Sequence, residues 1–395
     1  KVMHEIGIIQ SILDSDLYKF SMQQAVCKMY PNQIVRYEFC NRGQTKFPLG
    51  FAEKLRDEVA KMSNLALTKA EQKFLLSRGF FDPVYVDFLT GYRFDANEVT
   101  ILQTAGELQI TIQGYWYRTI LWEVPLMALI SELYFLELSP QIFPREVRRE
   151  NNHSKATVFC ANSLKLAEFG TRRRYSYANQ FEVCQDLQQM NSSEPFFVGS
   201  SNPYISMQLG LNVLGTQAHE WFMFMGAHYG VKMANYMALE KWVEVYGGNL
   251  GIALTDTYTS EVFFKTFNMK FAKLFDGVRH DSGCPFQFID KAVAHYLKLG
   301  ITPATKTIIF SDGLDSQTAL AIASYCHKSA IGCSFGIGTN LTNDLGVQPL
   351  NMVIKMTAAL IDNELVETVK LSDEISKHSG ESAQIKLIQQ TLGLV

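Results

Sequence analysis

From about residue 140 onward, the chain repeats one pattern: a short apolar run ends in Gly, Ser, Thr or Asp, and an amphipathic stretch follows. The endings lie roughly 15 to 40 residues apart, the length of a strand followed by a helix. They include Phe169-Gly170-Thr171, Gly199-Ser200-Ser201, Gly215-Thr216, Thr255-Asp256-Thr257, Arg279-His280-Asp281, Ser311-Asp312-Gly313 and Gly336-Ile337-Gly338. A series of this kind predicts a βα barrel, in which functional groups lie at the C-terminal ends of the strands.

The first third of the chain mixes helical and strand patterns and is expected to form a separate α/β domain over residues 1–145. The barrel is expected over 146–359. The tail 360–395, which is polar and helical in period after Asn363, is expected to return and pack on the first domain. The predicted helices are 16–29, 53–62 and 68–76, the predicted strand is 34–39, and the predicted hairpin pairs 99–103 with 107–113.

Composition excludes several classes of protein. Hydrophobic residues make up 47% of the chain and charged residues 19%, which is typical of a globular protein with a sizeable core. A net charge of −3 argues against general binding to nucleic acid or to an anionic membrane. The apolar stretch 119–138 contains three Glu and a Pro, so we expect a buried helix rather than a membrane span.

The location expected from the sequence is the cytoplasm. No signal peptide is evident in residues 1–10. The seven cysteines form no Cys-x-x-Cys pair, which favours reduced thiols, and no His and Cys spacing typical of a metal site is present.

The stretch Gly215-Thr216-Gln217-Ala218-His219 carries the strongest chemical signal. A strand-like run at 211–214 precedes it, and a helical pattern begins at His219. The first turn of a helix presents free backbone N–H groups and favours bound anions. His219 is therefore a candidate to bind phosphate or to accept a phosphoryl group; the alternative is a partly buried histidine that caps its own helix.

Three further endings contain candidate ligands for anions. Gly336, Gly338 and Thr339, together with Ser311-Asp312-Gly313 one unit earlier, allow close approach of backbone to a phosphate; tight turns are the alternative. Arg279 and Asp281 point to the same side of a strand, where the Arg could pair with a carboxylate and the Asp with ribose hydroxyls or magnesium. Mutual pairing of the two is the alternative.

Two segments outside this series are also candidates. Gly170, Thr171 and Arg172 open a cluster of three arginines that would neutralise a polyphosphate at a barrel mouth, or else form a solvated loop. Asp16 is a candidate helix cap, and the neighbouring Tyr18 could belong to the core or stack on a flat ring.

Taken together, these segments resemble the bacterial type of nicotinate phosphoribosyltransferase along essentially the whole chain. The segments that carry the resemblance are Leu13-Asp14-Ser15-Asp16-Leu17-Tyr18-Lys19, Glu168-Phe169-Gly170-Thr171-Arg172-Arg173-Arg174, Gly215-Thr216-Gln217-Ala218-His219-Glu220-Trp221, Arg279-His280-Asp281-Ser282-Gly283, Ser311-Asp312-Gly313-Leu314 and Gly336-Ile337-Gly338-Thr339-Asn340-Leu341. The resemblance implies an α/β fold, the irregular barrel of type II phosphoribosyltransferases joined to an N-terminal α/β domain.

The resemblance also implies an activity: joining nicotinate to phosphoribosyl pyrophosphate (PRPP) to give nicotinate mononucleotide for NAD salvage. ATP hydrolysis is coupled to this step through transient phosphorylation of His219, and Mg²⁺ enters with PRPP or ATP, near Asp281. A homodimer is implied, in which Tyr18 reaches the active site of the partner. The pyridine ring is then expected between Phe169 and Tyr18.

Further roles follow from the same resemblance. Arg172 and Arg279 would meet substrate anions, and Asp281 would hold ribose or metal. The remaining implied substrate contacts are Asp16, Gly170, Thr171, Ser200, Ser201 and Thr216. The implied phosphate contacts are Ser311, Asp312, Gly313, Gly336, Gly338 and Thr339.

Position 201 bears on the choice of substrate. Related nicotinamide-using enzymes have an Asp where this chain has Ser201, whereas a neutral Ser does not repel the nicotinate carboxylate. Ser200 replaces a more usual Thr, which is a mild change. The alternatives are a nicotinamide- or quinolinate-using phosphoribosyltransferase, a non-catalytic barrel that binds nucleotides or phosphosugars, and a phosphosugar isomerase or aldolase.

Overall fold

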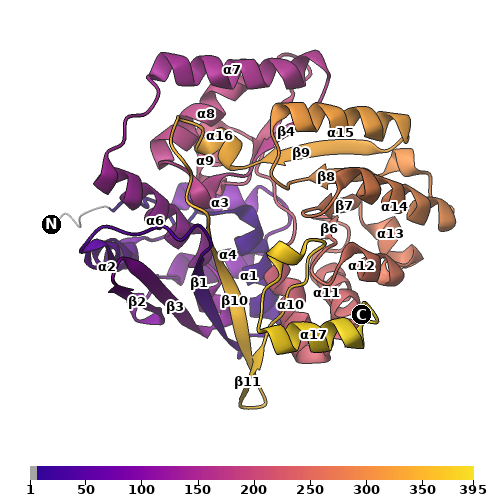
Figure 1. The fold of residues 1–395 in the computed structure, drawn as a ribbon, viewed down its shortest axis with the longest axis horizontal. Helices are drawn as coiled ribbons and strands as arrows, with labels where there is room; N and C mark the ends of the chain where they lie inside the picture. Colours follow the sequence, from indigo (N-terminus) through magenta and orange to yellow (C-terminus); the bar gives the residue numbers. More distant parts are fainter. Residues whose placement is uncertain (1–6) are drawn as a thin grey trace. The chain divides into compact units, whose positions relative to one another are not determined.

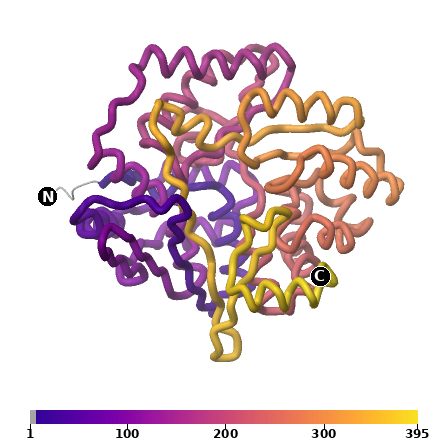
Figure 2. The backbone as a smooth tube through the Cα atoms, in the orientation of Figure 1, coloured from indigo at the N-terminus to yellow at the C-terminus, as the bar shows by residue number. Residues whose placement is uncertain are grey.

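The computed structural model describes residues 7–395; residues 1–6, on which the signal-peptide expectation partly rests, lie outside the described residues. The chain forms two compact units, drawn as a ribbon in Figure 1 and as a backbone tube in Figure 2. Unit 1 contains the described residues up to Ala156, Glu168–Leu214 and Gly338–Lys355. Unit 2 contains Thr157–Ala167, Gly215–Ile337 and Met356–Val395. The domain limits expected from the sequence stay a prediction.

Unit 1 contains an antiparallel sheet. Its strands β1 (Ile34–Asn41), β3 (Glu107–Tyr115) and β2 (Val99–Thr104) pair in that order. Alternate residues of β3 are buried, which is the pattern expected of a sheet with one face on the core. The hairpin between β2 and β3 agrees with the period-2 pattern of the sequence.

Helices cover the rest of unit 1. They are α1 (Leu17–Met29), α2 (Phe51–Lys61), α3 (Lys69–Leu76), α4 (Pro83–Gly91), α5 (Trp116–Thr119), α6 (Glu123–Leu138), α8 (Tyr177–Gln189), α9 (Pro203–Leu209) and α16 (Thr339–Thr342). Helix α7 (Arg145–Ala161) is divided between the units. The start of α3 shows how local sequence sets these limits, because Thr68 and Glu71 form a capping box.

The apolar run 119–138, predicted to form a buried helix, does form one. The helical stretch Trp116–Leu138 is long and apolar enough to cross a membrane by length and composition alone. However, 78% of its most apolar 18-residue window is buried inside the protein. Buried positions surround α6 on all sides, as expected for a helix in a protein core.

Unit 2 contains a parallel sheet in which β6 (Ile252–Leu254), β7 (Gly277–His280), β8 (Thr307–Phe310) and β9 (Gly332–Ile337) pair in sequence order. The central residues Ala253, Val278 and Ile308 are fully buried. This near-continuous burial is characteristic of a parallel sheet covered by helices. Strand β4 (Leu166–Glu168) is divided between the units, and β5 (Phe197–Ser200) belongs to unit 1.

The helices of unit 2 lie before, between and after its strands in the sequence. They are α10 (His219–Tyr229), α11 (Val231–Tyr246), α12 (Ser260–Thr266), α13 (Met269–Leu274), α14 (Pro285–Lys298), α15 (Ser316–Lys328) and α17 (Ser382–Thr391). Helix α15 packs beside β9, and α17 packs against α11. The hairpin of β10 (Met352–Ile361) and β11 (Glu364–Glu367) precedes the C-terminal segment, drawn in yellow in Figure 2.

The structure confirms most of the predicted elements and corrects two. The run 211–214 is not a strand; it contributes only an isolated bridge between Val213 and Ser200. The tail after Asn363 is helical only over α17 and the single turn Ile375–Lys377, because β11 and irregular backbone take up most of the rest. Short polar segments of this kind are decided by tertiary contacts rather than by propensity.

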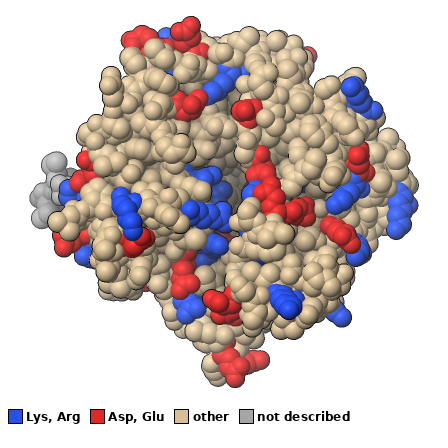
Figure 3. Space-filling model, viewed as in Figure 1, with Lys and Arg blue, Asp and Glu red and all other residues tan. Residues whose placement is uncertain are grey.

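Charged side chains of both signs are distributed over the surface. On the face drawn in Figure 3, Lys and Arg occur among Asp and Glu both at the centre and at the edges. This distribution agrees with the small net charge of −3.

Candidate active site

The residues singled out in the sequence fall into two groups, one in each unit. We call the group in unit 2 the His219 cluster: Thr216, His219, Asp256, Thr257, Arg279, Asp281 and Ser311. We call the group in unit 1 the Asp16 cluster: Asp16, Glu168, Phe169, Gly170, Thr171, Arg172, Ser200 and Ser201. Both groups consist mainly of residues at or just after the C-terminal ends of parallel strands, where α/β proteins place their ligands.

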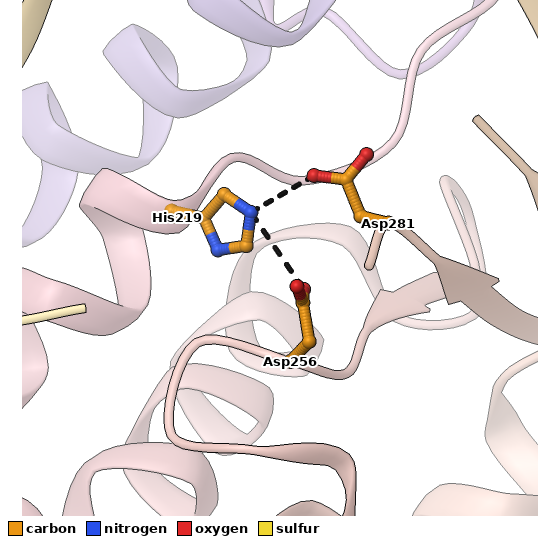
Figure 4. Close-up of side chains that lie close together, drawn as sticks. All are labelled: His219, Asp256 and Asp281. Carbon is orange, nitrogen blue, oxygen red and sulfur yellow. Dashed lines mark hydrogen bonds and ion pairs between the residues drawn. The ribbon is translucent and has the colours of Figure 1, made fainter. Parts of the chain in front are cut away.

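The His219 cluster is built around the first residue of α10. The Nδ1 atom of His219 lies 2.9 Å from the Thr257 hydroxyl, and its Nε2 atom lies 3.0 Å from Oδ2 of Asp281. Asp256 approaches the same Nε2 atom at 3.6 Å. Figure 4 shows the imidazole edge facing both carboxylates, which come from the loops after β6 and β7.

Arg279 connects the parts of this cluster. Its guanidinium donates to the hydroxyls of Ser311 and Thr216 at 2.7 and 2.8 Å and to the carbonyl of Gln217 at 3.1 Å. A fourth hydrogen bond, of 2.9 Å, goes to Oδ1 of Asp281. Because this carboxylate is also the partner of His219, the positions of the arginine and the imidazole are coupled.

The electrostatic environment sets the charge states. Burial lowers the pKa of His219, and the positive charge of Lys370 lowers it further, against the opposing effect of Asp256 and Asp281. Burial alone would raise the pKa of Asp281, but Arg279 and the hydrogen bond from His219 hold it well below its usual range. At neutral pH the cluster therefore contains a neutral imidazole beside an ionised carboxylate.

The segment 370–378 closes around these loops within unit 2. Lys377 donates to Oδ1 of Asp312 at 2.5 Å and to the Asp281 carbonyl at 3.1 Å. The backbone N–H of Leu371 donates to the Thr257 carbonyl at 2.8 Å, and that of Asp373 donates to the Ser282 hydroxyl at 2.9 Å. A segment distant in sequence thus holds the ends of β6, β7 and β8.

The predicted phosphate-binding residues differ in their surroundings. Ser311 lies inside the His219 cluster, where its hydroxyl donates to Asp281 at 2.8 Å. Gly313 is exposed and has a positive φ of 56°. Gly336 is buried in β9, whereas Gly338 and Thr339 belong to unit 1, at the start of α16.

Six of the eight residues of the Asp16 cluster are buried, and Phe169 and Arg172 are partly exposed. Asp16 occupies the N-cap position of α1, yet its carboxylate makes no capping hydrogen bond; Oδ1 accepts instead from the Ser201 hydroxyl at 2.6 Å. Burial raises the pKa of Asp16, which the positive charge of Arg172 opposes. The predicted helix start is thus confirmed with Asp16 at the N-cap position, but its carboxylate does not cap the helix, because a tertiary contact has taken its acceptor.

The arginines after β4 separate into structural and accessible ones. Arg174 is fully buried and forms a two-pronged ion pair with Asp14, at 2.6 and 2.8 Å. The side chain of Arg172 is 41% exposed, and its Nε lies 4.0 Å from Oδ2 of Asp16. Phe169 and Tyr18 are half-buried. Unlike Arg174, Arg172 is therefore partly exposed and lies beside a buried acceptor.

Sequence reasoning missed several residues of both clusters. Asp256 and Thr257 follow β6 in the same way that Asp281 follows β7, so the strand-end pattern contained the signal for both. Glu168 is a fully buried charged residue at the end of β4, and its burial could not be inferred from the sequence. Lys370 and Lys377 come from the tail, which carries no strand-end signal.

Oxygen ligands for a cation are present in the His219 cluster. His219, Asp256 and Asp281 each offer one ligand atom, and these atoms lie within 4.8 Å of one another. The Oδ1 atom of Asp256 is buried and has no hydrogen-bond partner among residues 7–395. A buried carboxylate oxygen without a donor is a suitable ligand for a hard divalent cation.

Comparisons with known proteins agree along the whole chain. Residues 164–393 match the nicotinate phosphoribosyltransferase (NAPRTase) family, and residues 13–131 match its N-terminal domain. The nicotinate phosphoribosyltransferase of Chromohalobacter salexigens is 49% identical over 98% of this chain and 99% of its own. That of Methanosarcina acetivorans is 41% identical over 98% of each.

Solved structures share the fold. The nicotinate phosphoribosyltransferase of Porphyromonas gingivalis is 43% identical and superposes with a TM-score of 0.94, covering 98% of this chain and all of its own. A putative nicotinate phosphoribosyltransferase of Saccharomyces cerevisiae, 30% identical, gives a TM-score of 0.93 over 99% of this chain and all of its own. The expected α/β fold of type II phosphoribosyltransferases is thereby confirmed. The chain belongs to the nicotinate phosphoribosyltransferase family, enzymes of the pentosyltransferase class.

Proposed function

We propose that the protein joins nicotinate to PRPP, releasing nicotinate mononucleotide and pyrophosphate, and that ATP hydrolysis is coupled to this step through phosphorylation of His219. The observation that carries the coupling is the neutral imidazole at the start of α10, held between Thr257 and two carboxylates. A helix N-terminus favours the negative charge that a phosphoryl group brings. NAD salvage is the pathway that this product serves.

The phosphoryl step uses the lone pair of Nδ1, which in this structure faces the Thr257 hydroxyl at 2.9 Å, so this contact has to break before the nitrogen attacks. Burial keeps His219 neutral, and a hydrogen bond from Nε2–H to Asp281 orients the ring. The nitrogen with the lone pair attacks the γ-phosphorus of ATP, the bond from phosphorus to the bridging oxygen breaks, and ADP leaves. Water later hydrolyses the phosphohistidine to histidine and phosphate, which restores the residue and makes each cycle consume one ATP.

In the glycosyl step the pyridine nitrogen of nicotinate attacks C1 of the ribose while the bond from C1 to pyrophosphate breaks. Arg279 supplies a fixed positive charge through a guanidinium held by four hydrogen bonds. A Mg²⁺ ion that enters with PRPP or ATP fits Asp256 and Asp281 and would neutralise phosphate charge there. The protein contributes positioning and charge stabilisation.

The Asp16 cluster favours nicotinate over nicotinamide in this proposal. Ser201 is neutral and almost fully buried, with its hydroxyl proton directed to Asp16. An acidic side chain at position 201 would repel the carboxylate of nicotinate, whereas Ser201 does not. Arg172 is the accessible cation of this cluster and the candidate partner of that carboxylate.

The proposed assembly is a homodimer in which Tyr18 stacks on the pyridine ring bound by the partner subunit, opposite Phe169. Tyr18 is half-buried near the start of α1. An aromatic face presented in this way supplies a large contact area for a flat heterocycle.

The experiment that tests the proposal uses the purified full chain with PRPP, Mg²⁺ and either nicotinate or nicotinamide, with and without ATP. Mononucleotide and ADP are quantified in each reaction. We expect nicotinate mononucleotide, with ADP released in step with product. In the variant His219→Ala we expect glycosyl transfer that no longer responds to ATP, because no phosphoryl acceptor remains.

Other results would overturn specific parts of the proposal. Product from nicotinamide and not from nicotinate would contradict the role of Ser201. ATP stimulation that persists in His219→Ala would contradict the phosphohistidine. If no product forms from either base, the non-catalytic binding protein becomes the better description.

A further inference from the structure

Glu168 is a fully buried carboxylate that nothing above gives a role in the reaction. It is the last residue of β4, and three N–H or O–H donors, as well as the Cys184 thiol at 3.7 Å, converge on it. Its Oε2 atom accepts from the Ser200 hydroxyl at 2.6 Å and from the side-chain amide of Gln180 at 3.0 Å. Its Oε1 atom accepts from the backbone N–H of Gly170.

A carboxylate at this position is costly for stability. Burial raises the pKa of Glu168, because the charged form loses its hydration, and the hydrogen bonds from Ser200, Gln180 and Gly170 oppose this effect. Buried polar clusters often cost as much to desolvate as their contacts return, and apolar replacements frequently fold as well or better. Stability alone therefore does not account for an acceptor-only group at the end of β4.

The donors of Glu168 define two loops of the Asp16 cluster. On the β4 side, Gly170 is held by its N–H to Glu168 and by its carbonyl, which accepts from the Thr342 hydroxyl at 2.8 Å. A Cβ at position 170 would overlap the Thr342 side chain and lie 2.8 Å from the Gly338 carbonyl. These hydrogen bonds and close contacts thus fix the position of the backbone at Gly170, directly after Phe169.

On the β5 side, the same carboxylate orients the Ser200 hydroxyl, which in turn accepts from the backbone N–H of Asn202 at 3.0 Å. The backbone N–H of Ser201 donates to the Glu168 carbonyl at 2.9 Å. Ser201 is therefore bracketed by residues that Glu168 holds, just as Phe169 is bracketed by Glu168 and Gly170.

We propose that Glu168 is a positioning residue for the pyridine base. In the proposed function Phe169 contacts the face of the pyridine ring and Ser201 lies beside the nicotinate carboxylate, and Glu168 sets the distance between these two residues. The inference rests on the proposed function and deepens it. Glu168 acts through the two loops and does not touch the substrate. Its loss therefore changes the affinity for the base more than the chemistry on the ribose.

The test compares Glu168→Gln with the exchange variant Glu168→Gln/Gln180→Glu. In the single variant one of the three donors faces an amide N–H₂ group and loses its acceptor. We expect the KM for nicotinate to rise by about 10-fold, with kcat and the KM for PRPP changed by less than about 2-fold. In the exchange variant the carboxylate introduced at position 180 accepts from the new amide and still faces Arg174, so the KM for nicotinate should return toward the wild-type value.

Glu132→Gln is the matched control. Glu132 is a largely buried carboxylate of α6 that accepts from the backbone N–H of Tyr177 at 3.0 Å, outside the Asp16 cluster. The variant Glu132→Gln should lower the melting temperature without raising the KM for nicotinate relative to the KM for PRPP. A uniform rise of both KM values in Glu168→Gln, or no rise for nicotinate in an active enzyme, overturns the inference.

The outcomes also distinguish the inference from the function on which it rests. A wild-type protein that makes no nicotinate mononucleotide overturns both. An active wild type with an unshifted KM in Glu168→Gln overturns the inference alone. If the single variant does not fold, the exchange variant decides: a wild-type KM for nicotinate supports the inference, and a raised one contradicts it.

Discussion

Asp14 and Asp16 are two residues apart, both are almost fully buried, and their surroundings differ sharply. Asp14 meets the guanidinium of Arg174 in a two-pronged ion pair and also accepts from Asn202. Asp16 accepts side-chain hydrogen bonds from Ser201, at 2.6 Å, and from Thr171, but its cation, Arg172, is distant, at 4.0 Å. The first arrangement compensates a buried charge well, whereas the second leaves a carboxylate in an environment that favours its neutral form.

Removing the charge of Asp14 should therefore destabilise the folded protein strongly. In Asp14→Asn the guanidinium of Arg174 stays buried without its two-pronged ion-pair partner, and we expect the free energy of unfolding to fall by about 3–5 kcal/mol. The control is Glu261→Gln, which breaks an ion pair with Lys265 whose side chains are 61% and 64% exposed. That pair should contribute about 1 kcal/mol or less. Urea denaturation of both variants checks the difference, and equal losses would contradict the assignment.

Removing the charge of Asp16 should raise the free energy of unfolding, and the size of this gain should depend on pH. A carboxyl group whose pKa is raised on folding binds a proton more readily in the folded state. It therefore costs stability above its folded pKa, and the cost disappears below its unfolded pKa. We expect Asp16→Asn to be more stable than wild type at pH 7, by about 0.5–2 kcal/mol, with the gain shrinking as the pH falls toward 4. Thermal unfolding at several pH values checks this; a gain that grows toward acid pH would contradict it.

At the scale of elements, the ends of β6, β7 and β8 carry the His219 cluster, and close packing of these strands sets its geometry. Gly277 begins β7 and pairs in register with Thr307 of β8. A Cβ at position 277 would overlap the Thr307 carbonyl and lie 2.8 Å from its carbon atom. Backbone cannot move aside as a flexible side chain can, so any side chain here pushes β7 away from β8.

Gly277→Ala is expected to destabilise the protein by about 1–3 kcal/mol, because overpacking displaces backbone. It should also lower kcat, because Arg279 and Asp281 follow on the same strand and loop. The matched control is Gly91→Ala at the end of α4, where an added Cβ meets nothing within 4 Å. That variant should keep wild-type stability and activity in thermal unfolding and turnover assays. A Gly277→Ala protein with normal turnover would show that the strands accommodate the methyl group.

At the scale of the whole molecule, the proposed chemistry depends on a second copy of the chain. If Tyr18 completes the site of the partner subunit, Tyr18→Ala and Arg279→Ala should each inactivate a homodimer. Random pairing of the two variants makes half of the dimers mixed, and each mixed dimer has one intact site. The unseparated mixture from co-expression of the two variants should therefore have about one quarter of wild-type activity. A different affinity tag on each variant allows the mixed dimers to be isolated. Full inactivity of the isolated mixed dimers would mean that Tyr18 serves its own subunit.

How far the sequence alone could predict this protein depends on the range of the interaction concerned. Local patterns were sufficient for α1, α3 and the hairpin of β2 and β3, because hydrophobic period, caps and turn residues act within a few positions. They failed at 211–214, where a strand-like run found only one bridging partner. Pairing partners are contributed by distant segments, so a short apolar run does not determine its own state.

The candidate site divides in the same way. The order of the polar endings already placed His219, Arg279 and Asp281 after predicted strands and at a predicted helix start, since these positions follow from the βα pattern itself. Only the tertiary structure decided that Asp16 accepts from Ser201 rather than capping α1, that Glu168 is a buried acceptor, and that the segment 370–378 closes on the strand ends. The physical reason is that burial and long-range hydrogen bonds, which set charge states and orient side chains, exist only once distant parts of the chain have packed together.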